Sequence, residues 1–430
     1  MNKSEIYVGL LGCGTVGGGV WKVFDKNRDI IQRRLGAAVT IKKVLEIDVE
    51  KAKAAGVPAD KISSSLEDIL NDQEIDIVVE VIGGTTIAGD FIKQALKAGK
   101  SVVTANKDLL AQEGEELYSL AADNGVDLLF EASVGGGIPI IRPLKECLSA
   151  NRVEAIYGIV NGTTNYMLTK MCAEGSNYND VLAEAKAKGY AEADPTSDVE
   201  GYDAARKLAI LASIAFNTRI SFKDVFVEGI TRITARDIMY AKELNYAVKL
   251  LAIGKENDGE VEVRVHPTLI PLNHPLASVN DVFNAIFVRG DAVGDVMFYG
   301  RGAGELPTAS AIAGDIIDAA RNIITDSRGR LGCTCYDNKT IKDAGDNMSK
   351  YYVRMKVLDK PGVLAAIATV FGNQEVSLAS VLQKRNIDNI AEIVWVTHCV
   401  LEKNVQDALK IIGGLSIVEE ISNVIRVEGE

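Results

Sequence analysis

The sequence predicts an α/β protein in three parts: a doubly wound parallel sheet, an α+β region, and a small ferredoxin-like unit at the C-terminal end. Short β-branched runs alternate with longer helical patterns over residues 1–130, which is the pattern of parallel β-α-β units. Residues 351–427 follow the order strand, helix, strand, strand, helix, strand, which is the split βαβ arrangement. A chain of 430 residues is also longer than a single hydrophobic core usually supports, so two or three domains are expected.

The first domain is expected over residues 1–135. Its strands are short, continuous apolar runs, as expected where helices cover both faces of a parallel sheet. The predicted strands are 7–11, 39–45, 75–81, 101–104 and 127–131, and the predicted helices are 17–35, 91–98 and 113–124.

The pattern changes near residue 136, and an α+β domain is expected over 136–325, with the segment 305–325 packing back on the first domain. Residues 326–350 are polar and turn-rich, as linkers are, and a compact last domain is expected over 351–430. The strands predicted for these two domains are 153–160, 261–270, 284–288, 295–299, 351–358, 376–384, 391–399 and 418–427, and the helices are 178–189, 200–216, 234–245, 308–324, 363–373 and 402–412.

Composition and charge exclude two classes of partner. The 59 acidic residues outnumber the 47 basic ones, and a net charge of −12 does not suit a phosphate backbone, so no nucleic-acid partner is expected. The most apolar run, 75–82, contains Asp76 and Glu80 and is far shorter than the ~20 residues of a membrane span. The N-terminal segment passes directly into a glycine loop and is typical of a strand, not of a signal peptide. We therefore expect a cytoplasmic protein with no membrane partner.

The cysteines do not predict a disulfide framework, because the chain is long and carries no secretion signal. Only Cys333 and Cys335 lie close together, as C-x-C. No other Cys or His lies within fifteen residues of this pair, so a zinc site is not expected there. The six cysteines are Cys13, Cys147, Cys172, Cys333, Cys335 and Cys399.

The segment GLLGCGTVGGGV places Gly12, Gly14 and Gly17 as G-x-G-x-x-G between the first strand and the first helix. In a Rossmann-type loop the first glycine permits the tight turn, the second lets the backbone approach a pyrophosphate, and the third allows close helix–strand packing. The start of the helix, with Thr15 and Val16, would then bind the phosphates. A glycine-rich turn without a ligand is the alternative, but the position directly after the first strand favours a dinucleotide site.

The end of the second strand should distinguish NAD from NADP, because an acid there holds the ribose hydroxyls and a basic residue holds the 2′-phosphate. This chain has Glu46, Ile47 and Asp48 at that point, with Ile47 where Arg or Lys would be expected for NADP. NAD and NADP therefore both remain candidate coenzymes.

Three further segments supply polar groups near strand ends. Ala105, Asn106 and Lys107 follow Thr104 at the end of the strand 101–104, at the edge where open α/β sheets bind ligands, although a solvated lysine is the alternative. NGTTNY at 161–166 offers amides and hydroxyls, which ordinary turn chemistry explains equally well. EASVGGGIP at 131–139 could surround a hard cation with a carboxylate and carbonyls, but from the residues alone a flexible crossing between domains is the simpler interpretation.

The densest polar cluster is KGYAEADPTSDVEGYDAARK at 188–207. Asp203 and Lys207 lie four residues apart on one face of a helix whose remainder is strongly apolar. A surface salt bridge is the alternative, but charges near the start of a largely buried helix suggest a functional role. None of the three histidines has metal-ligand spacing, so lysine and carboxylate groups are the candidates for proton transfer.

Taken together, these segments resemble homoserine dehydrogenase over nearly the whole chain. Residues 351–430 are similar to ACT domains, with DKPGVL at 359–364 at the first strand–helix junction, where such modules bind amino acids. The segments that carry the resemblance are GLLGCGTVG, VVTANKDLL, EASVGGGIPI, IVNGTTNY, GYAEADPTSDVEGYDAARK and FYGRGAGELPTA.

The resemblance implies reversible, NAD(P)H-dependent reduction of L-aspartate 4-semialdehyde to L-homoserine, a step toward threonine and methionine. Residues 136–325 would be the catalytic and dimerisation domain. Lys207 would donate the proton to the carbonyl oxygen, and Lys107 would be a second lysine at that oxygen. The other implied residues are Glu192, Asp203, Asp198, Gly162 and Thr163 for the substrate; Gly12, Gly14, Thr15, Val16, Gly17, Thr104, Ala105, Lys107, Gly189 and Gly304 for the coenzyme; and Glu131 with the carbonyls of Val134, Gly136 and Ile138 for a sodium ion.

A non-catalytic sensor of nucleotides and amino acids is the competing interpretation. A sensor needs no pair of lysines, so the presence of Lys107 and Lys207 with Glu192 and Asp203 disfavours it. The resemblance to ACT domains implies regulation by an amino acid such as threonine. Because ACT modules pair through their sheets, a homodimer or homotetramer is expected.

Overall fold

The structure is a computed structural model that describes residues 3–387 and 389–429. The chain divides into two compact units, each built from several segments. The described residues of 1–154, 206–224 and 284–338 form the first unit, and those of 155–205, 225–283 and 339–430 form the second. No helix in the described ranges has both the length and the apolarity that crossing a bilayer requires.

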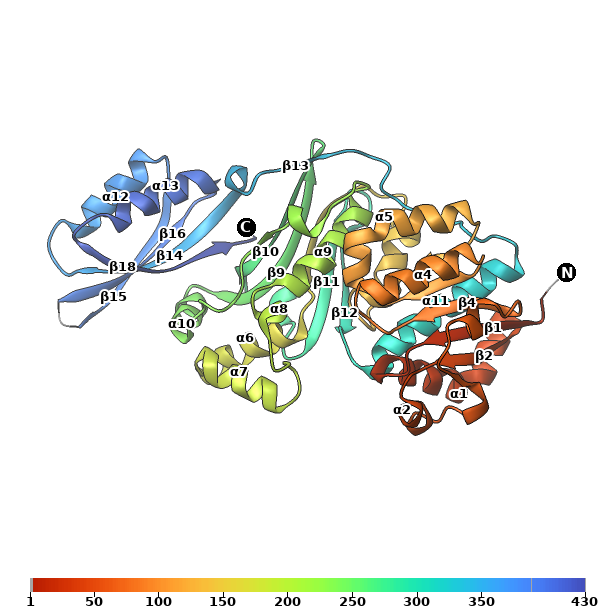
Figure 1. The fold of residues 1–430 in the computed structure, drawn as a ribbon. Helices are drawn as coiled ribbons and strands as arrows, with labels where there is room; N and C mark the ends of the chain where they lie inside the picture. The colour runs from red at the N-terminus through yellow and green to blue at the C-terminus, as the bar shows by residue number, and fades with distance from the viewer. Residues whose placement is uncertain (1–2, 388, 430) are drawn as a thin grey trace. The chain divides into compact units, whose positions relative to one another are not determined.

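The first unit contains a six-stranded, wholly parallel sheet in the order β3-β2-β1-β4-β5-β6 (Figure 1). The direction of the strand order reverses between β1 and β4, which is the point where doubly wound sheets bind ligands. The predicted Rossmann-type fold is confirmed for this part. The strands are β1 (Glu5–Leu11), β2 (Ala38–Leu45), β3 (Ile62–Ser63), β4 (Ile75–Glu80), β5 (Ser101–Thr104) and β6 (Leu128–Leu129).

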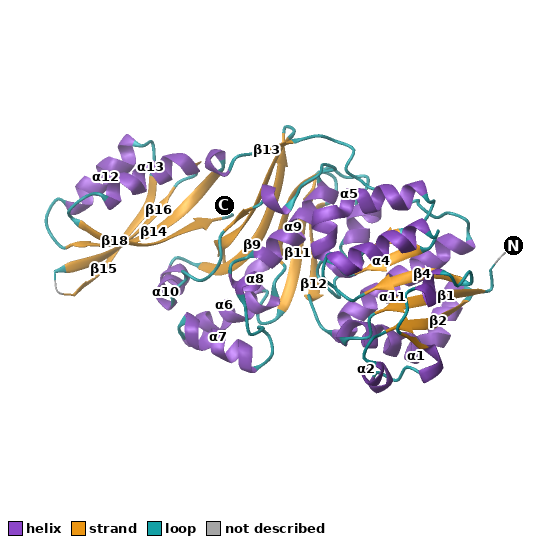
Figure 2. Ribbon diagram, viewed as in Figure 1, coloured by secondary structure: helices purple, strands orange, loops and turns teal. Residues whose placement is uncertain are grey.

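Helices cover both faces of this sheet (Figure 2). On one face α1 (Thr15–Leu35) packs along α11 (Glu305–Ile324), and on the other α4 (Thr86–Lys97) packs on α5 (Lys107–Asp123). A Cβ atom on Gly19 would lie 2.8 Å from the carbonyl oxygen of Glu305, so glycine lets α1 and α11 approach closely. The unit also contains α2 (Val49–Ala54), α3 (Glu67–Leu70), most of α9 (Tyr202–Ala215), most of β11 (Phe283–Gly290), and β12 (Gly294–Arg301).

Helix α5 begins at Lys107, six residues before the predicted start at residue 113. The reason is a cap: the side chain of Asn106 accepts a hydrogen bond from the amide of Leu109, which satisfies one of the donors at the helix start. Helix α4 likewise begins at Thr86 and not at residue 91. The short elements α2, β3 and α3 are absent from the prediction, because two to six residues carry too little periodicity to be recognised.

The second unit contains a mixed sheet in which β9 (Tyr246–Asn257) pairs with β7 (Val153–Ile159) and, along its whole length, with β10 (Glu260–Pro271). The prediction missed β9. Asp258 and Gly259, both with positive φ, form the two-residue turn between β9 and β10, and Asp-Gly is a recognisable hairpin signal. The helices of this unit are α6 (Gly162–Glu174), α7 (Tyr178–Ala187), α8 (Thr196–Val199), the start of α9 (Tyr202–Ala215), α10 (Ala235–Glu243), α12 (Val363–Asn373) and α13 (Glu402–Gly413).

The C-terminal part has the order β14-α12-β15-β16-α13-β18, as the ferredoxin-like prediction requires. Its core surrounds Trp395 and Phe371, whose rings lie 5.6 Å apart. Strand β18 also pairs in parallel with β10, so one sheet continues from the α+β part into the ferredoxin-like part. Short strands β8 (Phe226–Val227) and β13 (Thr340–Ile341) also pair with β10. The other strands are β14 (Met348–Leu358), β15 (Leu378–Ile387), β16 (Ile390–Thr397), β17 (Val400–Leu401) and β18 (Val418–Val427).

A buried ion pair joins β14 to α10 beside this sheet. Arg354 Nε lies 2.7 Å from Asp237 Oδ1, and both side chains are almost fully buried. Asn423 on β18 also donates a hydrogen bond to the same carboxylate, 2.9 Å away. Burial opposes the charged form, but the hydrogen bonds from Arg354 and Thr234 hold the pKa of Asp237 below its usual value.

We predict that Asp237→Ala lowers the free energy of unfolding by about 3–5 kcal/mol, because the buried Arg354 would lose its closest counter-charge and keep only the Glu392 carboxylate, 3.8 Å away. The wild-type contribution should be present above the ordinary aspartate pKa and disappear as the pH falls through the lowered value. Urea unfolding followed by Trp395 fluorescence, in a Trp21→Phe background, measures both effects. Lys356→Ala is the control, because its 2.6 Å pair with Glu420 is exposed and should change stability by less than about 1 kcal/mol. Equal losses in the two variants would contradict the prediction.

Candidate functional site

The glycine loop after β1 is closed by contacts that exclude side chains. Gly12 has φ +95°, and its amide donates to the carbonyl of Leu45 at the end of β2, 2.9 Å away. A Cβ atom on Gly17 would lie 2.1 Å from the carbonyl oxygen of Gly12. Any side chain at position 17 would therefore push α1 away from the loop.

The start of α1 is suited to an anion. Gly14 occupies the N-cap position and has no side chain to accept from the first-turn amides of Thr15, Val16 and Gly17. Unsatisfied amides at the positive end of a long helix bind phosphate well. The Lys51 Nζ adds a positive charge, since it lies 3.5 Å from the position that a Cβ on Gly14 would take.

The acid at the end of β2 contacts the glycine loop. Glu46 accepts hydrogen bonds from the amide of Cys13 (2.8 Å) and from the amide of Asp48 (3.1 Å). Ile47, between them, is 89% exposed. Glu46 is therefore held against the glycine loop, while the exposed Ile47 carries no charge.

A buried carboxylate organises the ends of β4 and β5. Glu80 is fully buried and accepts from the hydroxyl of Thr104, 2.7 Å away, as well as from two loop amides. The Thr104 oxygen accepts from the amide of Asn106 at 3.0 Å, and Asn106 caps α5. This chain of hydrogen bonds fixes the turn that starts α5 with Lys107. The sequence analysis missed Glu80, although an acid closing the apolar strand IDIVVE is a signal that could have found it.

Lys107 and Lys207 both belong to the first unit, on α5 and α9, and both are partly buried. A lysine in the first turn of a helix is disfavoured by the helix dipole, so Lys107 is not placed there for helix stability. Asp108, next to Lys107, forms a 3.1 Å ion pair with Arg206, next to Lys207. The first turn of α5 therefore contacts α9 at the residues adjacent to both lysines.

The loop 131–138 is buried and tightly folded in the first unit. The Glu131 carboxylate accepts from the amides of Ile140 (2.5 Å), Ile141 (2.8 Å) and Arg142 (2.8 Å), so it holds the next helical turn in place. Asp315 accepts from the Glu131 amide, and burial together with the nearby Glu131 raises the pKa of Asp315 to about 7.

The glycines of this region are needed for close backbone approach. A Cβ on Gly136 (φ +51°) would lie 2.4 Å from the Gly302 carbonyl, and Gly304 caps α11 with φ +121°. Loop carbonyls, including those of Val134, Gly136 and Ile138, are the hard oxygen donors available here. Among the described residues, no group of three or more His, Cys, Asp or Glu side chains is arranged to hold a metal ion.

In the second unit, Asn161 brings two predicted carboxylates together. Its side-chain amide donates to Asp198 (2.7 Å) and to Asp203 (2.9 Å), while its Oδ1 accepts from the amide of Thr164 and caps α6. Asp203 is 8% exposed. Sequence reasoning treated Asn161 as part of a polar turn and did not assign it this role; the pairing depends on a fold that joins residues 37 and 42 positions apart.

The other predicted substrate residues lie on α6 and on the loop after α7. Thr163 donates to the carbonyl of Tyr190 at 2.5 Å, and Gly162 begins α6 beside it. Gly189 turns the loop with φ +72°. Glu192 is exposed on the same loop and is not part of the hydrogen bonds made by the Asn161 amide.

Comparison with known proteins identifies relatives over the full length. Residues 12–131 match the family model for the NAD-binding domain of homoserine dehydrogenase, residues 139–317 match that of homoserine dehydrogenase, and residues 351–415 match that of the ACT domain. Homoserine dehydrogenase from Bacillus subtilis is 45% identical over 99% of this chain and 98% of its own length. The enzyme from Synechocystis is also 45% identical, over 98% and 99%.

Solved structures give the same result. A homoserine dehydrogenase from Thiobacillus denitrificans superimposes with a TM-score of 0.93 at 42% identity, covering 99% of this chain and 98% of that one. A hyperthermophilic archaeal homoserine dehydrogenase solved with NADPH covers 73% of this chain and 97% of its own, at 28% identity and a TM-score of 0.62.

We predict that Gly17→Ala raises the Kd for the reduced coenzyme at least about tenfold, because the methyl group would displace α1 from the Gly12 carbonyl. Fluorescence titration with NADH and with NADPH measures this constant. Gly314→Ala on α11 is the control, since its Cβ would meet nothing within 4 Å and the coenzyme affinity should not change. An unchanged Kd in Gly17→Ala would contradict the role given to the loop.

Proposed function

The chain belongs to the homoserine dehydrogenase family, and on that premise we propose how its residues bring about the reversible, NAD(P)-dependent interconversion of L-aspartate 4-semialdehyde and L-homoserine. One observation supports the proposal more than any other: the glycine loop lies at the switch point of the sheet, and β5, on the far side of β4, ends at Thr104, three residues before Lys107. A bound nicotinamide coenzyme supplies or accepts the hydride in such a reaction.

We propose that Gly12, Gly14, Gly17 and the first-turn amides of α1 hold the coenzyme's pyrophosphate. Glu46 would accept a hydrogen bond from a ribose hydroxyl, and the Lys51 ammonium would favour the additional 2′-phosphate of NADP. Since both groups are present, NAD and NADP are both proposed as coenzymes. Thr104 and Ala105 would line the nicotinamide end, and Gly189 and Gly304 would contact the coenzyme through their backbones.

Lys207 is proposed as the proton donor to the aldehyde oxygen during reduction, with Lys107 as a second ammonium group at that oxygen. Negative charge grows on the oxygen as hydride arrives, and a nearby cation stabilises and then protonates it. The Asp108–Arg206 ion pair supports this assignment, because it holds the first turn of α5 against α9 next to both lysines. In the reverse direction Lys207 would take the hydroxyl proton.

The substrate's amino group is proposed to bind at Asp198 and Asp203, with Glu192 contributing from its loop. Asn161 would keep the two carboxylates together and oriented, since one amide donates to both. A carboxylate pair held in this way attracts an ammonium group, whereas it would repel a carboxylate. Gly162 and Thr163, at the start of α6, are proposed to line the same site.

A sodium ion is proposed at the loop 131–138, bound by the carbonyls of Val134, Gly136 and Ile138 together with Glu131. The carboxylate of Glu131 already accepts hydrogen bonds from three backbone amides. Its proposed role is therefore to supply negative charge near the ion and to keep the loop in its conformation. The close approach of Gly136 to Gly302 supports a fixed loop whose carbonyls are oriented in advance. The ion would stabilise the loop and takes no part in hydride transfer.

The ACT domain is proposed to bind an amino-acid effector such as threonine at residues 359–364. The continuous sheet gives a route from this domain, through β18 and β10, to the catalytic part of the second unit. A homodimer or homotetramer in the cytoplasm is proposed as the working form.

We predict that Lys207→Ala lowers turnover by about 10²–10⁴-fold, as removal of a general acid does, while the Kd for the coenzyme barely changes. Initial rates of homoserine oxidation and fluorescence titration measure the two quantities on the same samples. Lys26→Ala, an exposed lysine on α1, is the control and should keep wild-type turnover. Near-normal turnover of Lys207→Ala would rule out the proposed role.

We predict that Gly362→Val raises the threonine concentration for half-inhibition at least about tenfold without changing turnover. Gly362 has φ +90° at the N-cap of α12, so a β-branched residue there distorts the effector loop. Removing residues 351–430 is a poorer test. The deletion would remove β18, which pairs with β10, and Arg354, which pairs with Asp237, so it would also disturb the rest of the second unit. Gly372→Ala on the same helix is the control, since its Cβ meets nothing within 4 Å. A wild-type chain insensitive to threonine would refute threonine as the effector.

A further inference from the structure

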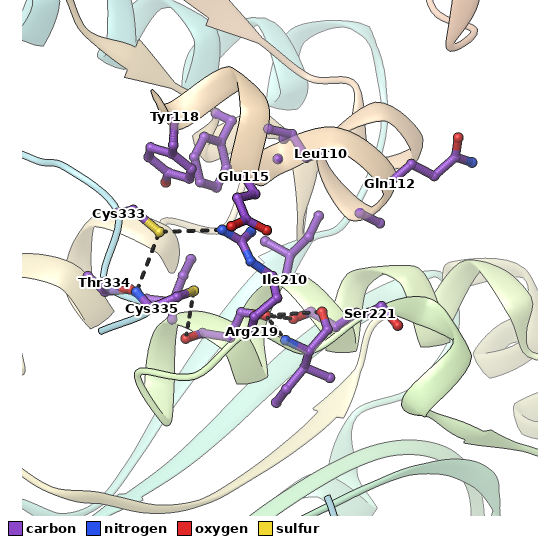
Figure 3. A pocket seen from close by; sticks show the side chains of 17 residues that line it. Leu110, Gln112, Glu115, Tyr118, Ile210, Arg219, Ser221, Cys333, Thr334 and Cys335 are labelled. Carbon is purple, nitrogen blue, oxygen red and sulfur yellow. Dashed lines mark hydrogen bonds between the residues drawn. The ribbon is translucent and has the colours of Figure 1, made fainter. Parts of the chain in front are cut away.

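A pocket in the first unit, away from the glycine loop, brings together the two cysteines of the C-x-C sequence (Figure 3). It has a volume of about 260 Å³, and its walls come from α5, from α9 and from the segment 333–335. Leu110, Ile210 and Ile214 make these walls partly apolar. Cys333 is exposed at its edge, so a small molecule in solution can reach the sulfur.

Three groups surround the Cys333 sulfur. Arg219 Nη2 donates to it at 3.7 Å, and the backbone amide of Cys335 donates to it at 3.4 Å. The thiol of Cys335 lies close by, and its sulfur is 3.8 Å from the carbonyl oxygen of Ser213. Figure 3 shows the Arg219 side chain reaching from the far wall toward this sulfur.

These surroundings separate the two thiols chemically. The hydrogen bond from the Cys335 side chain, against the effect of burial, lowers the pKa of Cys333 to about 5, with help from the Cys335 amide and Arg219. The neighbouring Cys333 and burial raise the pKa of Cys335. Burial also lowers the pKa of Lys145, near the pair, to about 8. These surroundings favour the thiolate form of Cys333 and the protonated thiol of Cys335.

We propose that Cys333 and Cys335 form a reversible oxidation site for small hydroperoxides, with Cys333 as the reacting thiol and Cys335 as the resolving thiol. This site is independent of hydride transfer. A solvent-accessible, activated thiolate beside a second thiol is the arrangement of redox-sensing cysteines. Metal binding is the other use of such a pair, and the described residues offer no third His, Cys, Asp or Glu ligand.

The chemistry balances in two steps. The Cys333 thiolate attacks one peroxide oxygen, the O–O bond breaks, and the leaving oxygen takes a proton from water, which leaves a sulfenic acid. The Cys335 sulfur then attacks the sulfenic sulfur, an S–S bond forms, and its proton leaves with the hydroxide as water. Two thiols lose two electrons in total and one peroxide gains them. Arg219 would stabilise the departing oxygen anion, and a dithiol would restore the reduced pair.

The first test is the rate of alkylation by iodoacetamide as a function of pH, read for each cysteine by peptide mass spectrometry of the full chain. Cys333 should react at a nearly constant rate from pH 6.5 to 7.5, because it is already a thiolate. N-acetylcysteine, a thiol free in solution, is the reference, and its rate should rise about tenfold over that interval. A tenfold rise at Cys333 would overturn the proposal.

The second test is treatment of the full chain with hydrogen peroxide. Wild type should lose about 2 Da per chain, with the new bond mapped to Cys333 and Cys335, and dithiothreitol should reverse it. Cys335→Ala should instead gain about 16 Da at Cys333 as a sulfenic acid, trapped by a diketone probe, and Cys333→Ser should show neither change. Arg219→Gln should slow the first step while leaving the product the same. Oxidation that begins at another cysteine, or a bond between two chains, would overturn the proposal.

Discussion

The architecture of the coenzyme end depends on one contact that only glycine permits. The carbonyl oxygen of Gly12 lies 2.1 Å from where a Cβ of residue 17 would be, so β1, the loop and α1 can close only around a missing side chain. That closure puts uncapped helix amides at the point where the strand order reverses. Glu46 at the end of β2 then holds the loop. The site is therefore fixed by backbone geometry first and by charge second.

At the same edge of the sheet, a buried carboxylate stabilises the turns that follow β4 and β5. Glu80 is fully buried, yet it accepts hydrogen bonds from Thr104 and from two amides, and the Thr104 oxygen in turn accepts from Asn106. Asn161 does the equivalent in the second unit, where its amide joins Asp198 to Asp203. In both cases a satisfied polar network fixes the position of groups that the proposed function assigns to ligand binding. These supporting residues are as necessary to the proposed chemistry as the lysines.

The sequence alone could supply the fold class and the glycine motif, because both depend on local pattern: apolar runs, helical periodicity and fixed glycine spacing. The twelve-residue strand β9 was missed because its apolar run has no clear period, although the Asp258-Gly259 turn that follows it was readable. Glu80, Asn161 and the contact between Asp108 and Arg206 depend on residues far apart in the sequence, which periodicity does not report. The cysteine pair is the clearest case. Cys335, two residues away, contributes most to the lowered pKa of Cys333, but Arg219 and Lys145, more than a hundred positions away, add to it, whereas the sequence alone indicated only that a zinc site was not expected.

The proposed chemistry requires two ammonium groups to act on one oxygen, and a crystal structure of the ternary complex with oxidised coenzyme and L-homoserine tests this requirement most directly. The distances to measure run from the homoserine hydroxyl oxygen to the Nζ atoms of Lys107 and Lys207. We expect both to be about 3 Å, within hydrogen-bonding range. A structure in which either side chain points away from that oxygen, with the substrate bound elsewhere, would contradict the assignment of the lysines while leaving family membership intact.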